Sequence, residues 1–369
     1  MADRGRDVNL PICVIGGGSI GRRHAEQAAK SPAARLTAVV ETDLSRGSEL
    51  SAAGLPVVSD IERVPKDTRA AIIATPTPDH CDSALAAISK GWGLLVEKPL
   101  AFTMAEADRI VSAASMADVP LYTGHHRRCH PFVIAARDEI CRLGDLVAIQ
   151  GIWALRKHAG YFEPPWRRER GSGPILTNLS HEIDLLRLFA GDVAMVSAMT
   201  MNAARGLPIE DTAAVIFRFA SGSMGTFLVS DAGVSPWNFE AASGENPMIP
   251  YSGQDSMRFI GTRASLSFPS LERWEGVTSE DVDWRKPLRG IPGAAMPRIN
   301  PILEQIGRFA QAVDGARDDI LSTGSDGRAA LAATLAVLHS DRTGKAIDPS
   351  AIADIGESAK GGSAGGLKH

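Results

Sequence analysis

A glycine-rich turn near the N-terminus constrains the fold of this chain more than any other feature. A β-branched apolar run over residues 11–16 leads directly into Gly16-Gly17-Gly18-Ser19-Ile20-Gly21. In a strand, turn and helix of this kind the backbone can approach a pyrophosphate, and the helix N-terminus offers free N–H groups and a positive dipole end. Because the chain holds 36 glycines, the flanking strand and helix carry the prediction rather than the glycines alone. We expect a dinucleotide to be bound by Gly16, Gly18, Ser19, Ile20 and Gly21.

The first third of the chain alternates short apolar runs with helical patterns. The runs lie at residues 11–16, 36–40, 70–75, 94–96 and 119–123, and the helical patterns at 19–30, 44–53, 79–90 and 104–116. Strands that alternate with helices predict a parallel sheet covered on both faces. We therefore expect an α/β N-terminal Rossmann domain, with a doubly wound parallel sheet, over residues 1–126.

The rhythm changes after residue 126. Helical patterns at 131–143, 301–313 and 325–340 enclose longer strand-like runs at 146–155, 193–201, 212–219, 222–230 and 257–260. Gly, Pro and Ser separate these runs, which predicts an α+β C-terminal domain with a large, mostly antiparallel open sheet. This domain is expected over residues 127–358, with a last helix free to pack back on the Rossmann domain, before a glycine-rich flexible tail at 359–369.

Bulk composition excludes several classes of function. With 39 Lys and Arg against 43 Asp and Glu, the net charge of −4 argues against a nucleic-acid partner. The N-terminus is charged and every apolar stretch is too short for a membrane span, which argues against a membrane or export. The four cysteines lack Cys-x-x-Cys spacing and predict reduced thiols in a cytoplasmic protein, at Cys13, Cys81, Cys129 and Cys141.

Glu41 follows the second strand, where an acid can accept hydrogen bonds from an adenosine ribose diol. A carboxylate there would also repel a 2′-phosphate, so NAD is the expected cofactor. Arg46, which is also expected to bind the cofactor, and the Arg22–Arg23 pair could offset this repulsion, so NADP stays possible.

Polar residues also stand where the third and fourth strands end. Thr75 and Pro76 are expected along the nicotinamide half of the cofactor, because ligands bind at the carboxyl ends of such strands. His80 is either a ligand contact or a helix cap. Beyond the next strand, Glu97-Lys98-Pro99 places a carboxylate and an amine at the same edge, and Glu97 and Lys98 are both expected to bind the cofactor. Lys98 there can orient a substrate hydroxyl, whereas a surface ion pair with Glu97 is the alternative.

These motifs resemble the glucose–fructose oxidoreductase / inositol dehydrogenase / MocA (Gfo/Idh/MocA) family. The resemblance rests on the glycine turn, Thr75-Pro76, His80 and above all Glu97-Lys98-Pro99, and it continues through residues 173–184 and Gly191. It implies NAD(P)-dependent hydride transfer involving a secondary alcohol of a sugar, cyclitol, related polyol or sugar acid. It also implies that Lys98 contacts both cofactor and substrate.

The motif at residues 171–184 supplies the second catalytic candidate. If it is a regular helix, Thr177, Asn178, His181 and Asp184 share one face, and His181 is oriented as a general base. A solvated face with a hydrogen-bonded histidine is the alternative. Members of the family commonly carry Asp where this chain has Thr177, and Thr cannot accept a proton. We therefore expect Lys98 and His181 to be the catalytic residues.

Substrate contacts are sought in the loops. A stretch rich in cations and aromatic residues after the strand at 146–155 could clamp a carboxylate or close over a sugar, or could simply be a solvated basic loop. The cluster at residues 125–130 lies at the domain junction and has no metal-site spacing, so no metal is expected. The substrate candidates are Arg128, Arg156, Tyr161, Trp166, Thr177 and Asn178, with Asp231, Trp237 and Glu240 in a further loop.

Two rival functions remain at this point. Some relatives oxidise, eliminate and re-reduce with NAD to cleave glycosides without net redox, and some proteins of this shape are non-catalytic dinucleotide-binding sensors. Lys98 and His181 argue against a sensor, which needs neither. An open sheet with an uncovered apolar face also predicts a homodimer or homotetramer.

Overall fold

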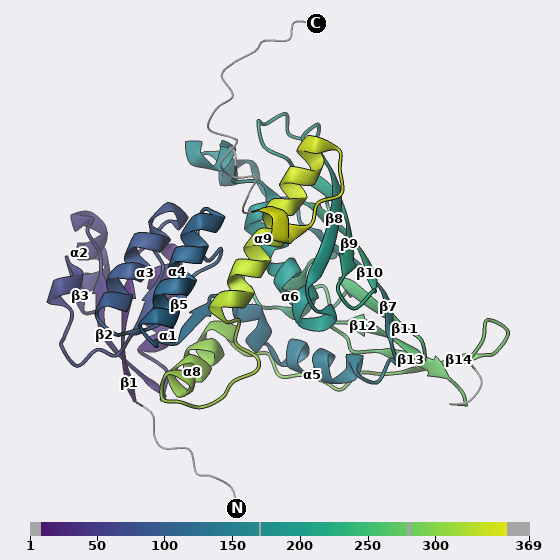
Figure 1. Cartoon of the computed structure of the whole chain (residues 1–369), viewed down its shortest axis with the longest axis horizontal. Coiled ribbons are helices and arrows are strands. Elements are labelled where there is room, and N and C mark those ends of the chain that lie inside the picture. The colour runs from purple at the N-terminus through teal and green to yellow at the C-terminus, as the bar shows by residue number, and fades with distance from the viewer. Residues whose placement is uncertain (1–8, 170, 279–281, 353–369) are drawn as a thin grey trace, which may run out of the picture.

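The computed structural model describes residues 9–169, 171–278 and 282–352, and it divides into two sheets of different kind (Figure 1). The predicted tail at 359–369 lies outside these residues. Both predicted fold classes are confirmed, a parallel sheet followed by a mostly antiparallel one. Helix α9 stands between the two sheets in Figure 1.

The N-terminal sheet has six parallel strands in the order β3-β2-β1-β4-β5-β6. Its strands are β1 Leu10–Ile15, β2 Ala34–Val40, β3 Val57–Val58, β4 Ala70–Ile73, β5 Gly93–Val96 and β6 Leu121–Thr123. The helices are α1 Ser19–Ala28, α2 Leu44–Ala52, α3 His80–Ser89 and α4 Met104–Met116. All of β4 and β5 is buried, as expected for strands covered on both faces. The strand order reverses between β1 and β4, which is where such sheets bind ligands.

The second sheet has eight strands in the order β14-β13-β12-β11-β7-β10-β9-β8. These are β7 Leu146–Ala154, β8 Val193–Met201, β9 Thr212–Phe219, β10 Met224–Ser230, β11 Met257–Gly261, β12 Ala264–Phe268, β13 Arg273–Gly276 and β14 Leu288–Ile291. Every neighbouring pair is antiparallel except β10 with β7. The sequence patterns missed the two-residue β3 and the short β12, β13 and β14.

Helices cover one face of this sheet. They are α5 Pro131–Ile140, α6 Ser180–Ala190, α7 Phe239–Ser243 and α9 Gly324–Thr343, whereas α8 Pro301–Val313 packs on the N-terminal half. Along β9, Val215, Phe217 and Phe219 are buried, while Ile216 between them is 48% exposed. Burying one such aromatic or aliphatic side chain stabilises the fold by about 1.5–3 kcal/mol. The alternation therefore fixes which face of the sheet meets the helices.

Two C-terminal helices tie the halves of the molecule together. Ile302, Ile306 and Phe309 of α8 belong to the same apolar core as residues of β1. Helix α9 meets β6 so closely that a Cβ at Gly327 would lie 2.0 Å from Oγ1 of Thr123. No helix in the described part of the chain combines the length and apolar character needed to cross a membrane. The division into domains at residues 126 and 127 stays a prediction, because α8 shares the N-terminal core.

Candidate active site

The glycine turn has the geometry that a bound dinucleotide needs. Gly16 has φ of +99°, and a Cβ there would lie 2.7 Å from the backbone of Ala74 and Thr75. A Cβ at Gly21 would lie 1.9 Å from the carbonyl oxygen of Gly16. These two glycines are required by close packing of backbone on backbone. A Cβ at Gly18, by contrast, would meet no atom within 4 Å, so this position faces open space.

Helix α1 begins at Ser19 without a side-chain cap. Its N-cap is Gly18, and its first turn holds no acidic residue. The N–H groups of Ser19, Ile20 and Gly21 belong to the first turn, where an α-helix supplies no internal acceptor. Together with the open space at Gly18, this fits a pyrophosphate bound at the turn.

Glu41 is buried at the end of β2 and is fixed by three donors. The N–H of Gly17 lies 3.0 Å from Oε2, the N–H of Asp43 lies 2.8 Å from Oε1, and Arg46 Nη1 lies 3.0 Å from Oε2. Burial opposes ionisation, but these hydrogen bonds lower the pKa of Glu41. A charged, immobile carboxylate therefore stands beside the glycine turn, and Arg46 is paired with it.

His80 has a different place from either one expected. It is 1% exposed, and its ring nitrogens lie 2.9 Å from the carbonyl oxygen of Pro99 and 3.0 Å from that of Thr75. His80 is thus a buried side chain that connects the loop of Thr75 and Pro76 to the turn after β5. It positions both loops and has no ring nitrogen left for a cofactor.

Glu97 also faces the protein interior. His24 Nε2 of α1 lies 2.6 Å from Glu97 Oε1, and both side chains are buried. Burial would raise the pKa of Glu97, but the hydrogen bond from His24 and the neighbouring cations lower it to about 2. Glu97 therefore joins the end of β5 to α1 through this hydrogen bond, and not to a cofactor as predicted.

Lys98 reaches from the first sheet to the second half of the chain. Its Nζ donates to the carbonyl oxygen of Thr177 at 3.1 Å. Burial, with Arg127 and Lys157 adding to it, lowers the pKa of Lys98 to about 8 against the opposing charge of Glu97. The structure therefore brings the two predicted motifs, at residues 97–99 and 171–184, into direct contact.

His181 lies at the same junction and is neutral. It is 8% exposed, and its ring centroid lies 5.4 Å from that of His126 and 6.1 Å from that of His125. Burial, followed by the charges of Lys98 and Arg127, holds the pKa of His181 well below its usual range. A neutral imidazole can accept a proton at neutral pH.

The helical face predicted around His181 is wrong in detail. Residues Ile175–Leu179 form a π-helical turn before α6, which inserts a residue and breaks the regular spacing. Asp184 therefore does not orient His181. It forms a bidentate ion pair with Arg128 at 2.7 and 2.8 Å, and among the described residues Nδ1 of His181 has no hydrogen-bond partner.

Arg128 is consequently a structural residue and not a substrate contact. It is 4% exposed and also lies 3.4 Å from Asp326 at the start of α9. The ion pair joins the turn after β6 to α6 and α9. The pattern of residues 125–130 placed Arg128 at the domain junction. It did not show that Arg128 forms ion pairs with Asp184 and Asp326.

Lys157, and not Arg156, is the cation at the end of β7. Arg156 is exposed and donates to the carbonyl oxygen of Ala232 at 3.0 Å. Lys157 is largely buried instead. Its Nζ lies 3.0 Å from Asn178 Oδ1 and 3.5 Å from Thr177 Oγ1.

The predicted aromatic contacts lie beside Lys157. Lys157 Nζ is 4.6 Å from the ring centroid of Tyr161, and Arg167 lies over the same ring at 4.1 Å. Trp166 is 56% exposed and contacts Arg167 at 5.0 Å. Tyr161 is therefore held between two cations, and Trp166 stands outside them.

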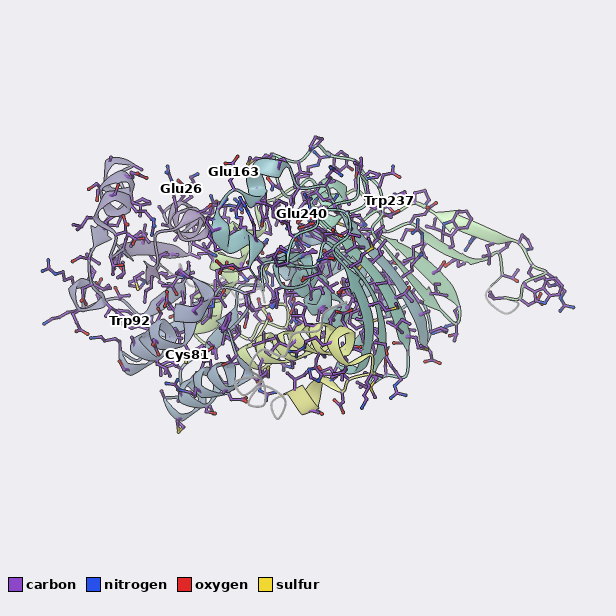
Figure 2. The ribbon with its side chains drawn as sticks, turned by 90° about the horizontal axis from the view of Figure 1, so that it is seen from above. Glu26, Cys81, Trp92, Glu163, Trp237 and Glu240 are labelled. Atoms are coloured by element: carbon purple, nitrogen blue, oxygen red, sulfur yellow. The ribbon has the colours of Figure 1, made fainter. Side chains whose placement is uncertain are left out.

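The three residues proposed from the loop at 230–254 have three different environments in the structure. Asp231 is buried, with Oδ1 3.0 Å from Arg205 Nε and Oδ2 3.3 Å from Lys157 Nζ. Glu240 accepts from Trp153 Nε1 at 2.7 Å and from Arg127 at 2.6 Å. Trp237 lies toward the sheet in Figure 2, where it borders a hollow on the open face, so it is not part of this site.

A buried acidic cluster behind His181 was missed from the sequence. Arg127 binds Glu182 at 2.6 Å as well as Glu240, and Glu245 lies 3.7 Å from it. Burial and the other glutamates raise the pKa of Glu182 to about 7 against Arg127. Within the described ranges, no group of three His, Cys, Asp or Glu residues is arranged to hold a metal ion.

The residues described above fit two tasks, binding a dinucleotide and handling the proton of an alcohol. The turn at residues 16–21 with Glu41 can hold a dinucleotide, and Lys98, Lys157 and His181 gather at the junction with the second sheet. An ammonium group can orient a hydroxyl oxygen, and a neutral imidazole can take its proton.

Comparisons with known proteins agree with this arrangement. Residues 10–125 match an oxidoreductase family with an NAD-binding Rossmann fold, and residues 139–267 match the GFO/IDH/MocA C-terminal domain. The 1,5-anhydro-D-fructose reductase of Ensifer adhaerens is 30% identical over 352 residues, covering 91% of this chain and 97% of that enzyme. The inositol 2-dehydrogenase of Rubrobacter xylanophilus is 27% identical over 285 residues, covering 73% of this chain and 74% of that enzyme.

A solved structure extends the likeness of the fold to nearly the whole chain. Levoglucosan dehydrogenase in complex with NADH and levoglucosan superposes with a TM-score of 0.75 at 21% identity. The match covers 92% of this chain and 99% of the dehydrogenase.

Proposed function

Because the chain belongs to the Gfo/Idh/MocA family of oxidoreductases with an NAD-binding Rossmann domain, we propose that it transfers hydride between a nicotinamide cofactor and a secondary alcohol of a sugar, cyclitol, related polyol or sugar acid. The membership confirms the resemblance, the oxidoreductase class and the dinucleotide cofactor predicted from the sequence. The observation that carries the proposal is the hydrogen bond from Lys98 to Thr177, which brings the predicted amine and histidine to one edge.

Lys98 and His181 have different roles in the proposed alcohol oxidation. The cofactor, when bound at the turn of residues 16–21, supplies the hydride acceptor. Lys98 donates to the substrate hydroxyl and holds its oxygen in place. His181, neutral and without a partner on Nδ1, takes the hydroxyl proton. Closure of the site between the two sheets provides proximity.

Glu41 supports a preference for NAD. Its charge is held beside the turn by Gly17 and Asp43, and a 2′-phosphate there would be repelled. Arg46 is already paired with Glu41, which reduces its capacity to bind such a phosphate. Initial rates with NAD and NADP at equal concentration test the preference directly.

Two alanine variants test the catalytic roles. Lys98→Ala and His181→Ala should each lower turnover by about a hundredfold or more, while the Kd for NAD stays nearly unchanged. Lys66→Ala, which removes an exposed lysine elsewhere on the N-terminal half, is the control. Reduced cofactor is followed by absorbance with polyols, aldoses and sugar acids. Wild-type activity in either variant would remove that residue from the mechanism.

The same assay separates this function from glycoside cleavage. An elimination cycle consumes a glycoside with no build-up of NADH, whereas a dehydrogenase forms one NADH for each alcohol oxidised. A sensor would bind NAD and oxidise none of the compounds.

We further propose that a second copy of the chain covers the open sheet face. Met199, Ala214, Leu228 and Ile152 lie side by side on four neighbouring strands and border a hollow of about 840 Å³. A flat apolar row of this kind can pack against its own copy about a two-fold axis. Leu228→Lys should shift the oligomer toward monomers in sedimentation. The free thiols suit a reducing compartment, and we propose the cytoplasm.

A further inference from the structure

Two ammonium groups from different halves of the molecule meet at Thr177. Lys98 Nζ, beyond the end of β5, donates to the Thr177 carbonyl oxygen at 3.1 Å. Lys157 Nζ, beyond the end of β7, lies 3.5 Å from the Thr177 hydroxyl and 3.0 Å from Asn178 Oδ1. The groups between the two cations are a carbonyl, a hydroxyl and an amide, and all three are neutral.

The positive charge of Lys157 is only partly offset. Its acidic partner, Asp231, lies 3.3 Å away and is fully buried. The same carboxylate also binds Arg205 at 3.0 Å, so one negative charge serves two cations. Lys157 itself has a side chain only 10% exposed, so water does little to solvate its charge.

The other acids around the junction are engaged elsewhere. Glu97 directs one carboxylate oxygen to His24 and the other to the backbone N–H of Lys98. The acids of the buried cluster behind His181 surround Arg127, and Glu240 also accepts from Trp153. None of these hydrogen bonds reaches the ammonium group of Lys98 or Lys157.

The neighbours of Lys157 extend the positive surface toward solvent. Arg167 lies over the ring of Tyr161 on which Lys157 also rests. The two cations that act most strongly on His181 are Lys98 and Arg127, and both lower its pKa. Lys157 therefore shares its one acidic partner, Asp231, with Arg205, and its other close polar neighbours are neutral.

We propose that the alcohol oxidised here carries a carboxylate, and that Lys157, with Asn178 and Thr177, binds this carboxylate and determines substrate specificity. This inference rests on the proposed dehydrogenase function. A monoanion matches the single surplus charge at Lys157, and its arrival would neutralise an ammonium group that is poorly solvated. The substrate class is thus sugar acids and related hydroxy acids.

Matched pairs of compounds test the substrate class. Initial rates of NADH formation are compared for D-gluconate with D-glucitol, D-galactonate with D-galactitol, and D-glucuronate with D-glucose. We expect the acid of at least one pair to be oxidised with a kcat/KM about 10- to 100-fold above its neutral partner, the value of one charged hydrogen bond. Equal or better use of the neutral partner in every pair would overturn the proposal and leave the dehydrogenase function intact. Exclusive use of a sugar phosphate such as D-glucose 6-phosphate would overturn it as well.

Variants of Lys157 test the residue. Lys157→Met keeps most of the side-chain volume and removes the charge, so the ratio of kcat/KM for the acid to kcat/KM for its neutral partner should fall about 10- to 100-fold. Lys157→Arg should retain part of the preference. Arg156→Met removes a charge from the neighbouring exposed position and should leave the ratio unchanged. If Lys157→Met and Arg156→Met give the same ratio, Lys157 does not bind the carboxylate.

A second variant and a binding assay guard against misfolding and inactivity. Thr177→Asp places a carboxylate where the two ammonium groups meet and should also lower the preference for the acid. Quenching of tryptophan fluorescence by gluconate, with NAD present, reports binding without turnover because Trp153 lies 6.0 Å from Lys157. Gluconate binding that Lys157→Met abolishes supports the role of Lys157 in binding the carboxylate. If gluconate binds in this way and no compound is oxidised, the dehydrogenase function fails and only the carboxylate-binding role of Lys157 stands. Binding unaffected by the variant would overturn the proposal.

Discussion

The two walls of the candidate site are built in opposite ways. The dinucleotide wall is a run of six residues, 16–21, whose geometry follows from backbone conformation and from the absence of side chains. The facing wall combines Lys157, Thr177, His181 and Asp231, which come from separate elements and meet only in the folded chain. Backbone geometry is encoded locally, whereas the charge of an assembled wall depends on which side chains neutralise each other.

The walls also differ in charge. Glu41 lies beside the dinucleotide turn and Glu97 binds His24 of α1, while Lys98 and Lys157 both lie at Thr177 and Asn178. Because Glu97 and Glu41 are both held by nearby donors, their charges are fixed in place. A site with this asymmetry can bind a cofactor through its backbone and select a substrate through its charge.

The largest expected effect concerns the buried ion pair of Arg128 with Asp184, which joins the elements around the assembled wall. Arg128→Met would leave Asp184 buried without its partner, so the free energy of unfolding should fall by about 3–5 kcal/mol. Urea denaturation measures this loss. The control is Arg137→Met, whose pair with the 70% exposed Asp319 should matter by less than about 1 kcal/mol. Unchanged stability together with a raised KM would instead restore Arg128 to the substrate site.

The next effect concerns the local wall. Gly21→Ala would force its Cβ against the Gly16 carbonyl oxygen, so the turn must shift and NAD should bind about 100-fold more weakly. NADH fluorescence titration measures the Kd. Gly307→Ala makes the same change in helix α8, where the added Cβ meets no atom, and should be neutral or stabilising by up to about 1 kcal/mol. Normal NAD affinity in Gly21→Ala would show that the turn tolerates a side chain.

A smaller effect is expected in the pH dependence of kcat/KM, through the titration of Lys98. Burial lowers the pKa of Lys98 to about 8, with Arg127 and Lys157 acting in the same direction and Glu97 and Glu240 against it. The ammonium form is therefore lost as the pH rises through about 8, while His181 is already neutral at pH 7. We expect kcat/KM for alcohol oxidation to fall above about pH 8.

Lys98→Arg tests the origin of this limb. A guanidinium keeps its charge at high pH, so the fall should move upward even if the overall rate is lower. Rates that continue to rise through pH 9 in the wild type would indicate that neutral Lys98 acts as a base. An unchanged limb in Lys98→Arg would assign the titration to another group.

The sequence was sufficient for the parts of the site that repeat a local pattern. The glycine turn, the acid after β2 and the residues after β5 each follow a buried strand, and parallel strands bring their carboxyl ends to one edge. The helix α4 and the helix α8 were predicted with their observed bounds, because caps and apolar spacing mark both ends. The short strands β12, β13 and β14 were missed because they depend on pairing with neighbours.

The roles of individual polar side chains were harder to predict. His80 and Glu97 were expected at the cofactor, but their partners are Pro99, Thr75 and His24. Arg156 was named as a candidate and Lys157 was not. Both are cations in the same loop, and the sequence does not show which of them reaches Thr177 and Asn178. One π-helical turn moved Asp184 away from His181 and toward Arg128.

The amino-acid sequence by itself determined that this chain forms a dinucleotide-binding turn, a parallel sheet and a second, open sheet. Those features depend on φ restrictions, hydrogen bonding along the backbone and the period of apolar residues, which are properties of neighbours in sequence. Only the tertiary structure decided three pairings. Lys98 donates to Thr177, Arg128 forms an ion pair with Asp184, and Lys157 shares the carboxylate of Asp231 with Arg205. Such pairings are set by distance through space, because buried charges require partners wherever the fold supplies them.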